Sequence, residues 1–196
     1  MARPRKHALP SIDEIRARLD YDPETGEFRH KARVGADTLI KAWNTRYAGK
    51  LAGCQMNGGY WFIRCGRQAL LGHRIAWAHY YGEWPDELDH RDGNKLNNRI
   101  DNLRPATRHQ NCWNRPGRAS AGYKGVALRV LPNGRLRYRA RIASGGVVMH
   151  IGTYDTAELA HAAYKKAARR KHKSFANFDI VRVGKIAATI VFGVAA

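Results

Sequence analysis

The densest group of side chains able to do chemistry lies between residues 88 and 114. This stretch reads LDHRDGNKLNNRIDNLRPATRHQNCWN and is rich in carboxylate, amide and imidazole groups: Asp89, His90, Asp92, Asn94, Asn97, Asn98, Asp101, Asn102, His109, Asn111 and Asn114. Asn and Asp are also common in solvated turns. Here, however, the stretch begins with an acid–histidine pair after a short strand-like run and ends at a helix-capping box, Thr107 with Gln110. A strand end, a polar loop and a helix can bring such groups to one ion.

These residue types suit the hydrolysis of a phosphodiester. A neutral His, with a pKa near ~6.5, accepts a proton from water at physiological pH. An Asp carboxylate and an Asn carbonyl are hard oxygen ligands, which suit Mg²⁺ or Mn²⁺. Such an ion acts as a Lewis acid and stabilises charge that develops on oxygen. The composition of the stretch therefore predicts metal-dependent hydrolysis.

Four short sequence motifs of this stretch resemble the HNH endonuclease family, in particular the phage and intron-encoded homing endonucleases with a ββα-metal finger. They are DH at 89–90, DGNKLNN at 92–98, NL at 102–103 and AT-RHQN at 106–111. The resemblance implies that His90 is the general base and that Asp89 and Asn111 are the protein ligands of a divalent metal. It also implies that Asn102, twelve positions after His90, fixes the histidine loop and orients His90.

Two arginines flank this group. Arg104 and Arg108 are candidates to grip a phosphate, and Arg108 is the stronger of the two because it shares a predicted helix with Asn111. The alternative for each is a solvated charge. His73 and His79, in an apolar helical pattern, are better explained as structural residues than as catalytic ones.

Composition limits the classes of partner. With 196 residues the chain has room for one or two small domains, and its 35 Lys and Arg against 16 Asp and Glu give a net charge of +19. Such an excess predicts binding to polyanions. No apolar run is long enough to span a membrane and the start lacks a signal-peptide core, so we expect a cytoplasmic, intracellular protein. Three cysteines without a CxxC pair argue against a zinc knuckle or disulfide framework and favour free buried thiols.

The part before residue 88 predicts small elements. Ser11 and Glu14 form a capping box for a helix over 12–19, and Pro23 with Gly26 mark a turn before a short strand. Three strands are expected at 50–55, 60–65 and 68–72, separated by glycine turns. A helix over 73–84 should follow.

The C-terminal part has a different character. Residues 117–178 carry 13 Lys and Arg against 2 Asp and Glu, whereas the first 116 residues carry 20 against 13. In the run GRLRYRARIA, arginine alternates with apolar residues, so one face of a strand carries arginine and the other faces a core. Strands at 123–130 and 147–154 and a helix after Thr156 complete a small sheet-on-helix module.

This module resembles the ethylene-response-factor (Apetala-type) DNA-binding domain, over roughly 123–178. The matching runs are YKGVALRV, GRLRYRARI, HIGTYDTAELAHAAY and SFANF. The resemblance implies that the sheet enters the major groove of DNA. The expected DNA-facing set is Arg129, Arg135, Arg137, Arg139 and Arg141, for which the alternative is a solvated charged face. Tyr138 stands where that family usually has Trp, which leaves the sequence preference open.

We therefore expect an α+β protein. Its parts are an HNH nuclease module over 1–116 with a ββα-metal core at about 73–114, a linker at 117–122, a DNA-binding module at 123–178 and an apolar tail at 179–196. The expected function is an endonuclease that uses Mg²⁺ or Mn²⁺ to cleave double-stranded DNA, in a phage or mobile-element setting. A DNA-binding regulator with a silent finger and an RNA-directed nuclease remain as alternatives. The tail could add a strand, drive self-association or lack order.

Overall fold

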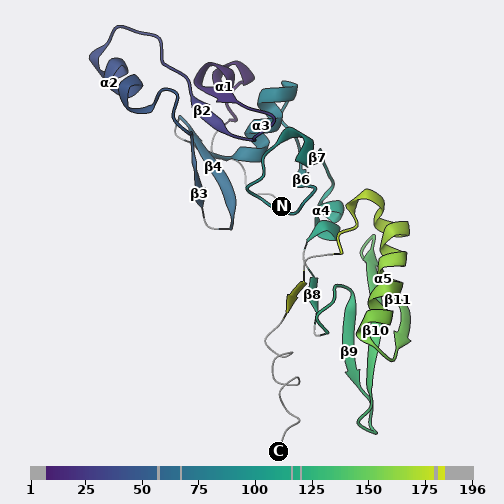
Figure 1. Cartoon of the computed structure of the whole chain (residues 1–196). Coiled ribbons are helices and arrows are strands. Elements are labelled where there is room, and N and C mark those ends of the chain that lie inside the picture. Colours follow the sequence, from purple (N-terminus) through teal and green to yellow (C-terminus); the bar gives the residue numbers. More distant parts are fainter. Residues whose placement is uncertain are drawn as a thin grey trace, which may run out of the picture. The chain divides into compact units, whose positions relative to one another are not determined.

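The computed structural model describes residues 8–56, 58–66, 68–115, 117–119, 121–178 and 181–183 (Figure 1). The chain divides into two compact units, Met1–Ala106 and Thr107–Ala196. Helices are mixed with small antiparallel sheets, which confirms the expected α+β class.

The first unit begins with the expected helix and turn. Helix α1 (Ile12–Arg18) starts at a complete capping box, in which the Ser11 hydroxyl accepts from the Glu14 N–H and the Glu14 carboxylate accepts from the Ser11 N–H. Strands β1 (Leu19–Tyr21) and β2 (Phe28–His30) then form a two-stranded antiparallel hairpin.

The next element is not predicted by the sequence analysis. Helix α2 (Thr38–Tyr47) follows β2 and is capped by the Asp37 carboxylate, which accepts from the Leu39 N–H at 2.9 Å. None of its residues, all of which the structure describes, is buried. Because α2 lacks an apolar face packed on the core, it leaves no periodic signal of the kind used to predict helices.

A three-stranded sheet and a helix come next. Strands β3 (Cys54–Met56), β4 (Tyr60–Cys65) and β5 (Gln68–Leu71) pair in the order β3-β4-β5, close to the expected ranges. Helix α3 (Gly72–Tyr81) ends at Gly82, whose φ of 78° is the left-handed conformation that glycine adopts at low cost.

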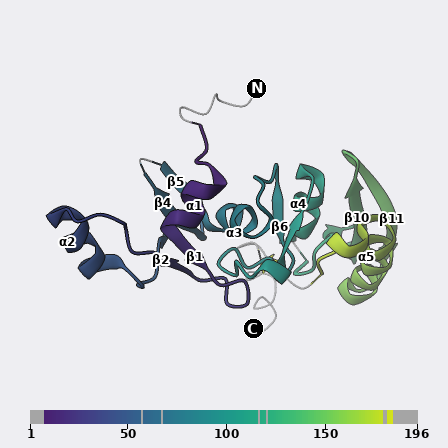
Figure 2. The same ribbon diagram turned by 90° about the horizontal axis from the view of Figure 1, so that it is seen from above.

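One apolar core joins these elements. It contains Ile15, Leu19, Phe28, Ile63 and Ile75, all nearly inaccessible to solvent. Six of the ten residues of α3 are buried, spread around the helix, and α3 lies between α1 and the hairpin that follows (Figure 2). That hairpin consists of β6 (Leu88–His90) and β7 (Leu103–Pro105), with a 3₁₀ turn (Ile100–Asn102) before β7.

The second unit starts with helix α4 (Arg108–Asn114), which has the expected capping box of Thr107 and Gln110. The unit boundary at Ala106 falls before the nuclease module was expected to end, at residue 116. The reason is packing: Trp113 stacks on His172 with ring centroids 4.5 Å apart, and the Asn177 amide donates to Asn114 Oδ1 at 2.9 Å. The Lys124 ammonium also donates to the Trp113 carbonyl at 2.5 Å.

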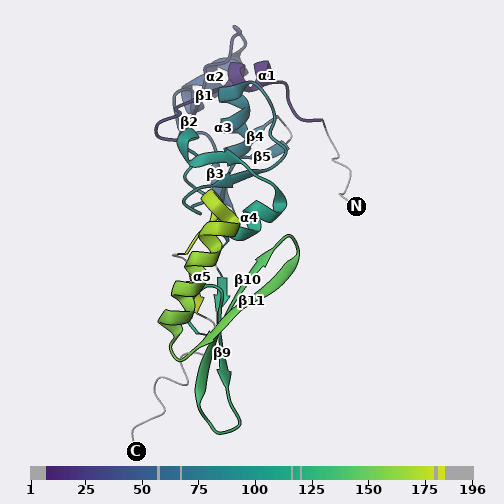
Figure 3. The ribbon, with the colours of Figure 1, turned by 90° about the vertical axis from the view of Figure 1, so that its right-hand side faces the viewer.

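The expected sheet-on-helix module is present. Strands β9 (Val126–Val130), β10 (Leu136–Ser144) and β11 (Val147–Tyr154) form an antiparallel sheet with β10 in the centre. Helix α5 (Ala157–His172), capped by Thr156, packs on one face of it, and a 3₁₀ turn (Lys173–Phe175) follows (Figure 3). Gly125, with φ of 77°, allows the chain to pass the Tyr164 ring, since a Cβ there would lie 2.1 Å from it.

The remaining strands modify two expectations. Strand β8 (Gly117–Ala119) lies inside the expected linker and pairs in parallel with β12 (Val181–Val183), so this part of the tail is an added strand. The rest of the tail, 179–180 and 184–196, lies outside the described residues, as do residues 1–7. The three cysteines are free as expected, but Cys65 alone is buried, since Cys54 and Cys112 are exposed. Among the described residues, no helix is long and apolar enough to cross a membrane.

Candidate active site

The β6–β7 hairpin holds an acid–base pair in its register. Asp89 lies directly opposite Arg104, and both residues are only 7% exposed. Arg104 donates from Nε at 2.9 Å and from Nη2 at 2.6 Å to the same oxygen, Asp89 Oδ2. This buried pair fixes the orientation of the carboxylate. Arg104 is therefore not the solvated charge considered from the sequence, and its expected contact with DNA stays a prediction.

His90 ends β6 in a buried pocket of rings. Its side chain is 6% exposed, and its ring lies 4.9 Å from the His73 ring, edge to face, and 6.2 Å from the Tyr60 ring. On one side, His90 Nε2 lies 3.4 Å from Asn98 Oδ1, and Asn98 is itself buried. The rings and the amide together limit the orientations that the imidazole can take.

Burial sets the charge of both histidines. It lowers the pKa of His90 below its usual value, although the Asn98 hydrogen bond acts in the opposite direction. Burial lowers the pKa of His73 to about 3, helped by the positive charge that His90 and Arg74 carry when protonated. His73 Nδ1 has no hydrogen-bond partner among the described residues. At neutral pH both rings are therefore uncharged, as a proton acceptor must be.

Asn102 holds the loop that follows His90. Its Nδ2 donates to Asp92 Oδ1 at 3.0 Å and to the Asn97 carbonyl at 2.9 Å, and its Oδ1 accepts from the Asp92 N–H at 3.1 Å. Its carbonyl accepts from the Arg91 N–H at 2.8 Å. Partial burial opposes ionisation of Asp92, but hydrogen bonds from Asn97, Asn94 and Asn102 lower its pKa. The amide of Asn102 thus links the loop backbone to Asp92, and its expected role of fixing the histidine loop stays a prediction.

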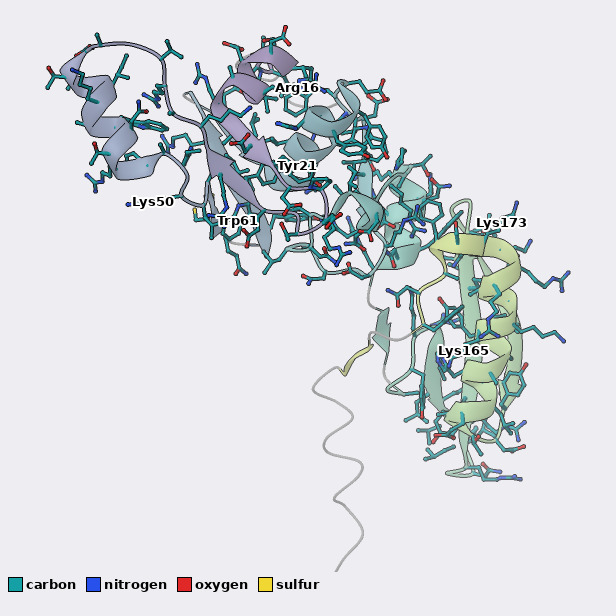
Figure 4. The ribbon with its side chains drawn as sticks, turned by 45° about the horizontal axis from the view of Figure 1, so that its top comes forward. Arg16, Tyr21, Lys50, Trp61, Lys165 and Lys173 are labelled. Carbon is teal, nitrogen blue, oxygen red and sulfur yellow. The ribbon has the colours of Figure 1, made fainter. Side chains whose placement is uncertain are left out.

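Two earlier segments support this loop. The Tyr21 hydroxyl, labelled in Figure 4, donates to the Asn98 carbonyl at 2.8 Å. The β1–β2 turn approaches so closely that a Cβ on Gly26 would lie 2.6 Å from the Arg99 nitrogen, and a Cβ on Gly72 would lie 3.1 Å from Asn98 Nδ2. The N-terminal hairpin and the start of α3 therefore place the amide that contacts His90.

The other two predicted residues of the nuclease centre lie on α4, in the second unit. Arg108 is exposed and Asn111 is half-buried, and a spacing of three residues puts them on one side of the helix. The structure thus brings Asp89, His90, Asn102 and Arg104 together in the first unit. The ββα arrangement as a whole stays a prediction.

The arginines of the C-terminal sheet occupy the face opposite α5. In β10, Tyr138, Ala140 and Ile142 pack toward the helix, so Arg137, Arg139 and Arg141 point the other way. Arg129 in β9 lies directly opposite Arg137. Arg135 precedes β10 in the hairpin turn, where its N–H donates to Asn133 Oδ1. All five remain predicted DNA contacts.

Two details of that sheet concern the predicted DNA-facing strand. Arg137 forms an ion pair with Asp155, so it is not purely a solvated charge. Tyr138, at the position that departs from the family pattern, is half-buried against α5 and does not belong to the arginine face.

The donor set for a metal is sparse. Among the described residues, no three His, Cys, Asp or Glu side chains cluster as a metal site. The expected ligands, one carboxylate and one amide, are too few to form such a cluster. They suit a hard divalent ion that keeps several waters. The oriented Asp89 carboxylate fits such a role chemically.

Sequence reasoning missed three participants. Asn98 was one of many amides in the loop, and only folding shows that its side chain reaches His90. His73 was read as structural, and Tyr60 was not singled out. The sequence did contain a signal for His73. Burying a polar imidazole at the start of a core-facing helix costs folding free energy unless its ring nitrogens form hydrogen bonds, so such a residue is a candidate for a role beyond packing.

Comparisons with known proteins identify a family for the segment that contains this site. Residues 71–112 match the family model described as HNH endonuclease. The chain is 32% identical over 93 residues to Protein 3.8 of Escherichia phage T7, covering 46% of this chain and 74% of that protein. It is 35% identical over 97 residues to an uncharacterized HNH endonuclease of Acanthamoeba polyphaga mimivirus, covering 48% and 49%. No solved structure matches. These findings give no evidence for the ethylene-response-factor resemblance, which stays a prediction.

Proposed function

Because this chain belongs to the HNH endonuclease family, we propose that it is a metal-dependent endonuclease that hydrolyses phosphodiester bonds in double-stranded DNA. One observation carries the proposal. A buried, uncharged imidazole, His90, ends β6 beside an amide that restricts its ring, within the segment that matches the family.

His90 acts as the general base. Asn98 Oδ1 can only accept a hydrogen bond, so in the neutral ring the proton lies on Nε2 and the lone pair on Nδ1. Nδ1 is then the atom that takes a proton from the attacking water. The low pKa of His90 keeps the ring in its accepting form at physiological pH.

Asp89 and Asn111 would hold a divalent cation, Mg²⁺ or Mn²⁺. When bound, such an ion supplies Lewis-acid stabilisation of charge on the phosphate and on the departing 3′ oxygen. Arg104 orients the Asp89 carboxylate through the two hydrogen bonds to Oδ2. The family resemblance implies 5′-phosphate and 3′-hydroxyl products.

The other residues position or bind. Asn102 holds the loop next to His90, and Arg108 contacts a phosphate from α4. The arginine face of the C-terminal sheet binds duplex DNA and raises the local concentration of the target. With one such centre per chain, a single molecule nicks one strand. A phage or mobile-element setting and an intracellular location complete the proposal.

The test is cleavage of supercoiled plasmid. Wild type with Mg²⁺ or Mn²⁺ should convert the plasmid to open circles, and EDTA should prevent this. His90→Ala should slow cleavage by about 10²–10⁴-fold, the usual contribution of general-base catalysis, while duplex binding is unchanged. His150→Ala, which removes an exposed imidazole from β11, is the matched control; because His150 lies opposite Arg141, cleavage is compared at enzyme concentrations that saturate the plasmid, where this variant should cleave normally.

Other results would redirect the proposal. Cleavage by His90→Ala at the wild-type rate would remove His90 as the base. Silence of the wild type on its native genomic DNA, with binding retained, would indicate a regulator. Preferential competition by duplex RNA would indicate an RNA-directed enzyme, since the deep A-form major groove does not admit a sheet.

A further inference from the structure

Helix α2 lacks the usual reason for a helix to form. It follows β2 as an excursion from the first unit and packs against none of its other helices (Figures 1 and 2). All its described residues are exposed or half-buried. Helices of this length are marginal in water without tertiary packing. A surface cluster of rings and cations must therefore supply much of what holds α2 in place.

That cluster is a cation–aromatic stack. The Arg33 guanidinium lies 3.8 Å from the centre of the Trp43 ring, and the Arg46 guanidinium lies 5.4 Å from the centre of the Tyr47 ring. Trp43 and Tyr47, one helical turn apart, have centroids 5.4 Å apart, and the His30 ring contacts both. We call Arg33, Trp43, Arg46 and Tyr47 the α2 surface.

The backbone at Arg33 is held as well. Asn44 accepts from the Arg33 N–H at 2.8 Å and donates to the Arg33 carbonyl at 2.9 Å, so one amide fixes both groups. A guanidinium stacked on a ring keeps its N–H donors in the plane of the fork, available to an oxyanion. Arg33 itself is exposed. The α2 surface thus presents a pre-oriented arginine fork to solvent.

The charges near the surface separate into two groups. Residues 29–50 contain six Lys and Arg against one acid, Asp37. Arg29 pairs with Glu27 and Lys31 pairs with Asp20. Within the part of the chain that the structure describes, Arg33, Lys41, Arg46 and Lys50 form no ion pair; Lys50 lies just past the end of α2 (Figure 4). Of these four cations, Arg33 and Arg46 lie on the rings of one side of α2, where together they complement a polyanion.

We propose that the α2 surface binds the sugar–phosphate backbone of duplex DNA, as a contact site of the first unit separate from the arginine face of the C-terminal sheet. The inference rests on the proposed function, because it takes DNA as the polyanion. The stacked arginines supply forked donors to phosphate, and the rings hold the forks in orientation. Such contacts carry no base code, so the site adds affinity rather than sequence preference.

The experiment measures duplex binding by the full chain in EDTA, which blocks metal-dependent cleavage. A labelled 40-base-pair duplex is titrated at several KCl concentrations. Arg33→Ala and Arg46→Ala should each raise the Kd about 3- to 10-fold and lower the slope of log K against log salt by about 0.9, the value for one phosphate contact. The double variant should lower the slope by about 1.8.

Lys41→Ala is the matched control. It removes one positive charge from the same helix, at a position about 160° around the axis from Trp43, and should leave the slope unchanged. Helix α2 should persist in both variants, because the Asn44 hydrogen bonds to the backbone of residue 33 and the contact between the Trp43 and Tyr47 rings remain, and circular dichroism would check this. An equal loss of affinity in Lys41→Ala would overturn the assignment to one face.

Further outcomes separate this inference from the proposed function. Wild-type duplex affinity in the double variant would overturn the inference, and so would a defect confined to anionic vesicles or to an acidic peptide. If the wild type bound duplex through the α2 surface but cut no plasmid, the inference would stand and the nuclease assignment would fail. If the double variant bound duplex and cut plasmid as well as the wild type, the nuclease assignment would stand and the inference about the α2 surface would fail.

Discussion

Two antiparallel regions of this protein use arginine in opposite ways. In the β6–β7 hairpin, Arg104 lies opposite a carboxylate, Asp89, and both are buried. In the C-terminal sheet, Arg137 lies opposite another arginine, Arg129, on the face away from α5. A buried charge needs its own partner inside the protein, whereas like charges opposite each other are tolerated where a partner can come from outside. Burial thus distinguishes an arginine that orients a carboxylate from the arginines that we propose to bind a polyanion.

The largest effect should come from breaking the buried pair. Arg104→Met keeps much of the apolar volume but leaves the Asp89 carboxylate buried without its guanidinium. We expect the free energy of unfolding of the first unit to fall by about 3–5 kcal/mol, as measured by urea denaturation. The surface pair Arg99–Asp101, with side chains 49% and 68% exposed, is the control, and Arg99→Met should cost only about 0–1 kcal/mol. Equal losses would show that burial does not distinguish the two pairs.

A smaller effect should follow from acid. The folded-state pKa of His73 is about 3, below its usual value, so between about pH 6.5 and 3 the unfolded chain binds a proton that the folded chain excludes. Stability of the first unit should therefore fall with falling pH, by up to about 1.4 kcal/mol per pH unit from this group. His73→Phe should flatten the profile in urea melts between pH 7 and 4. If the free energy of unfolding of the variant fell with pH as steeply as that of the wild type, His73 would not be the group that resists protonation in the folded state.

The smallest effects should appear on the arginine face of the C-terminal sheet. Arg139→Ala should weaken duplex binding severalfold and lower the salt slope by about one unit. Arg137→Ala should weaken duplex binding less, because the charge of Arg137 is partly neutralised by its ion pair with Asp155. Asp155→Asn should strengthen duplex binding, because it removes that ion pair. Fluorescence titrations across a KCl series would measure all three. Unchanged slopes in both arginine variants would mean that this face does not contact phosphate.

The features that sequence predicted are local ones. The capping boxes at Ser11 and Thr107 and the alternation in β10 depend on residues within a few positions of each other, so their spacing alone defines them. The same holds for the strand-end pair Asp89-His90, whose position at the end of β6 the structure bears out.

The features that sequence did not predict depend on contacts made only after folding. Arg104 reaches Asp89 through the register of two strands fifteen residues apart, and Asn98 reaches His90 because Tyr21 and the β1–β2 turn hold its backbone. Helix α2 was missed because its ring stack, unlike a core-facing stripe, has no apolar period.

The division of the chain at Ala106 has a consequence for recombination. Helix α4 is tied to the C-terminal unit by the Trp113–His172 stack and by hydrogen bonds from Lys124 and Asn177. A gene fusion that exchanged the proposed DNA-binding part after residue 116 would remove these contacts from α4. A junction between Ala106 and Thr107 would transfer α4 together with its packing partners. An exchange at that junction would therefore transfer Arg108 and Asn111 along with the rest of the C-terminal unit.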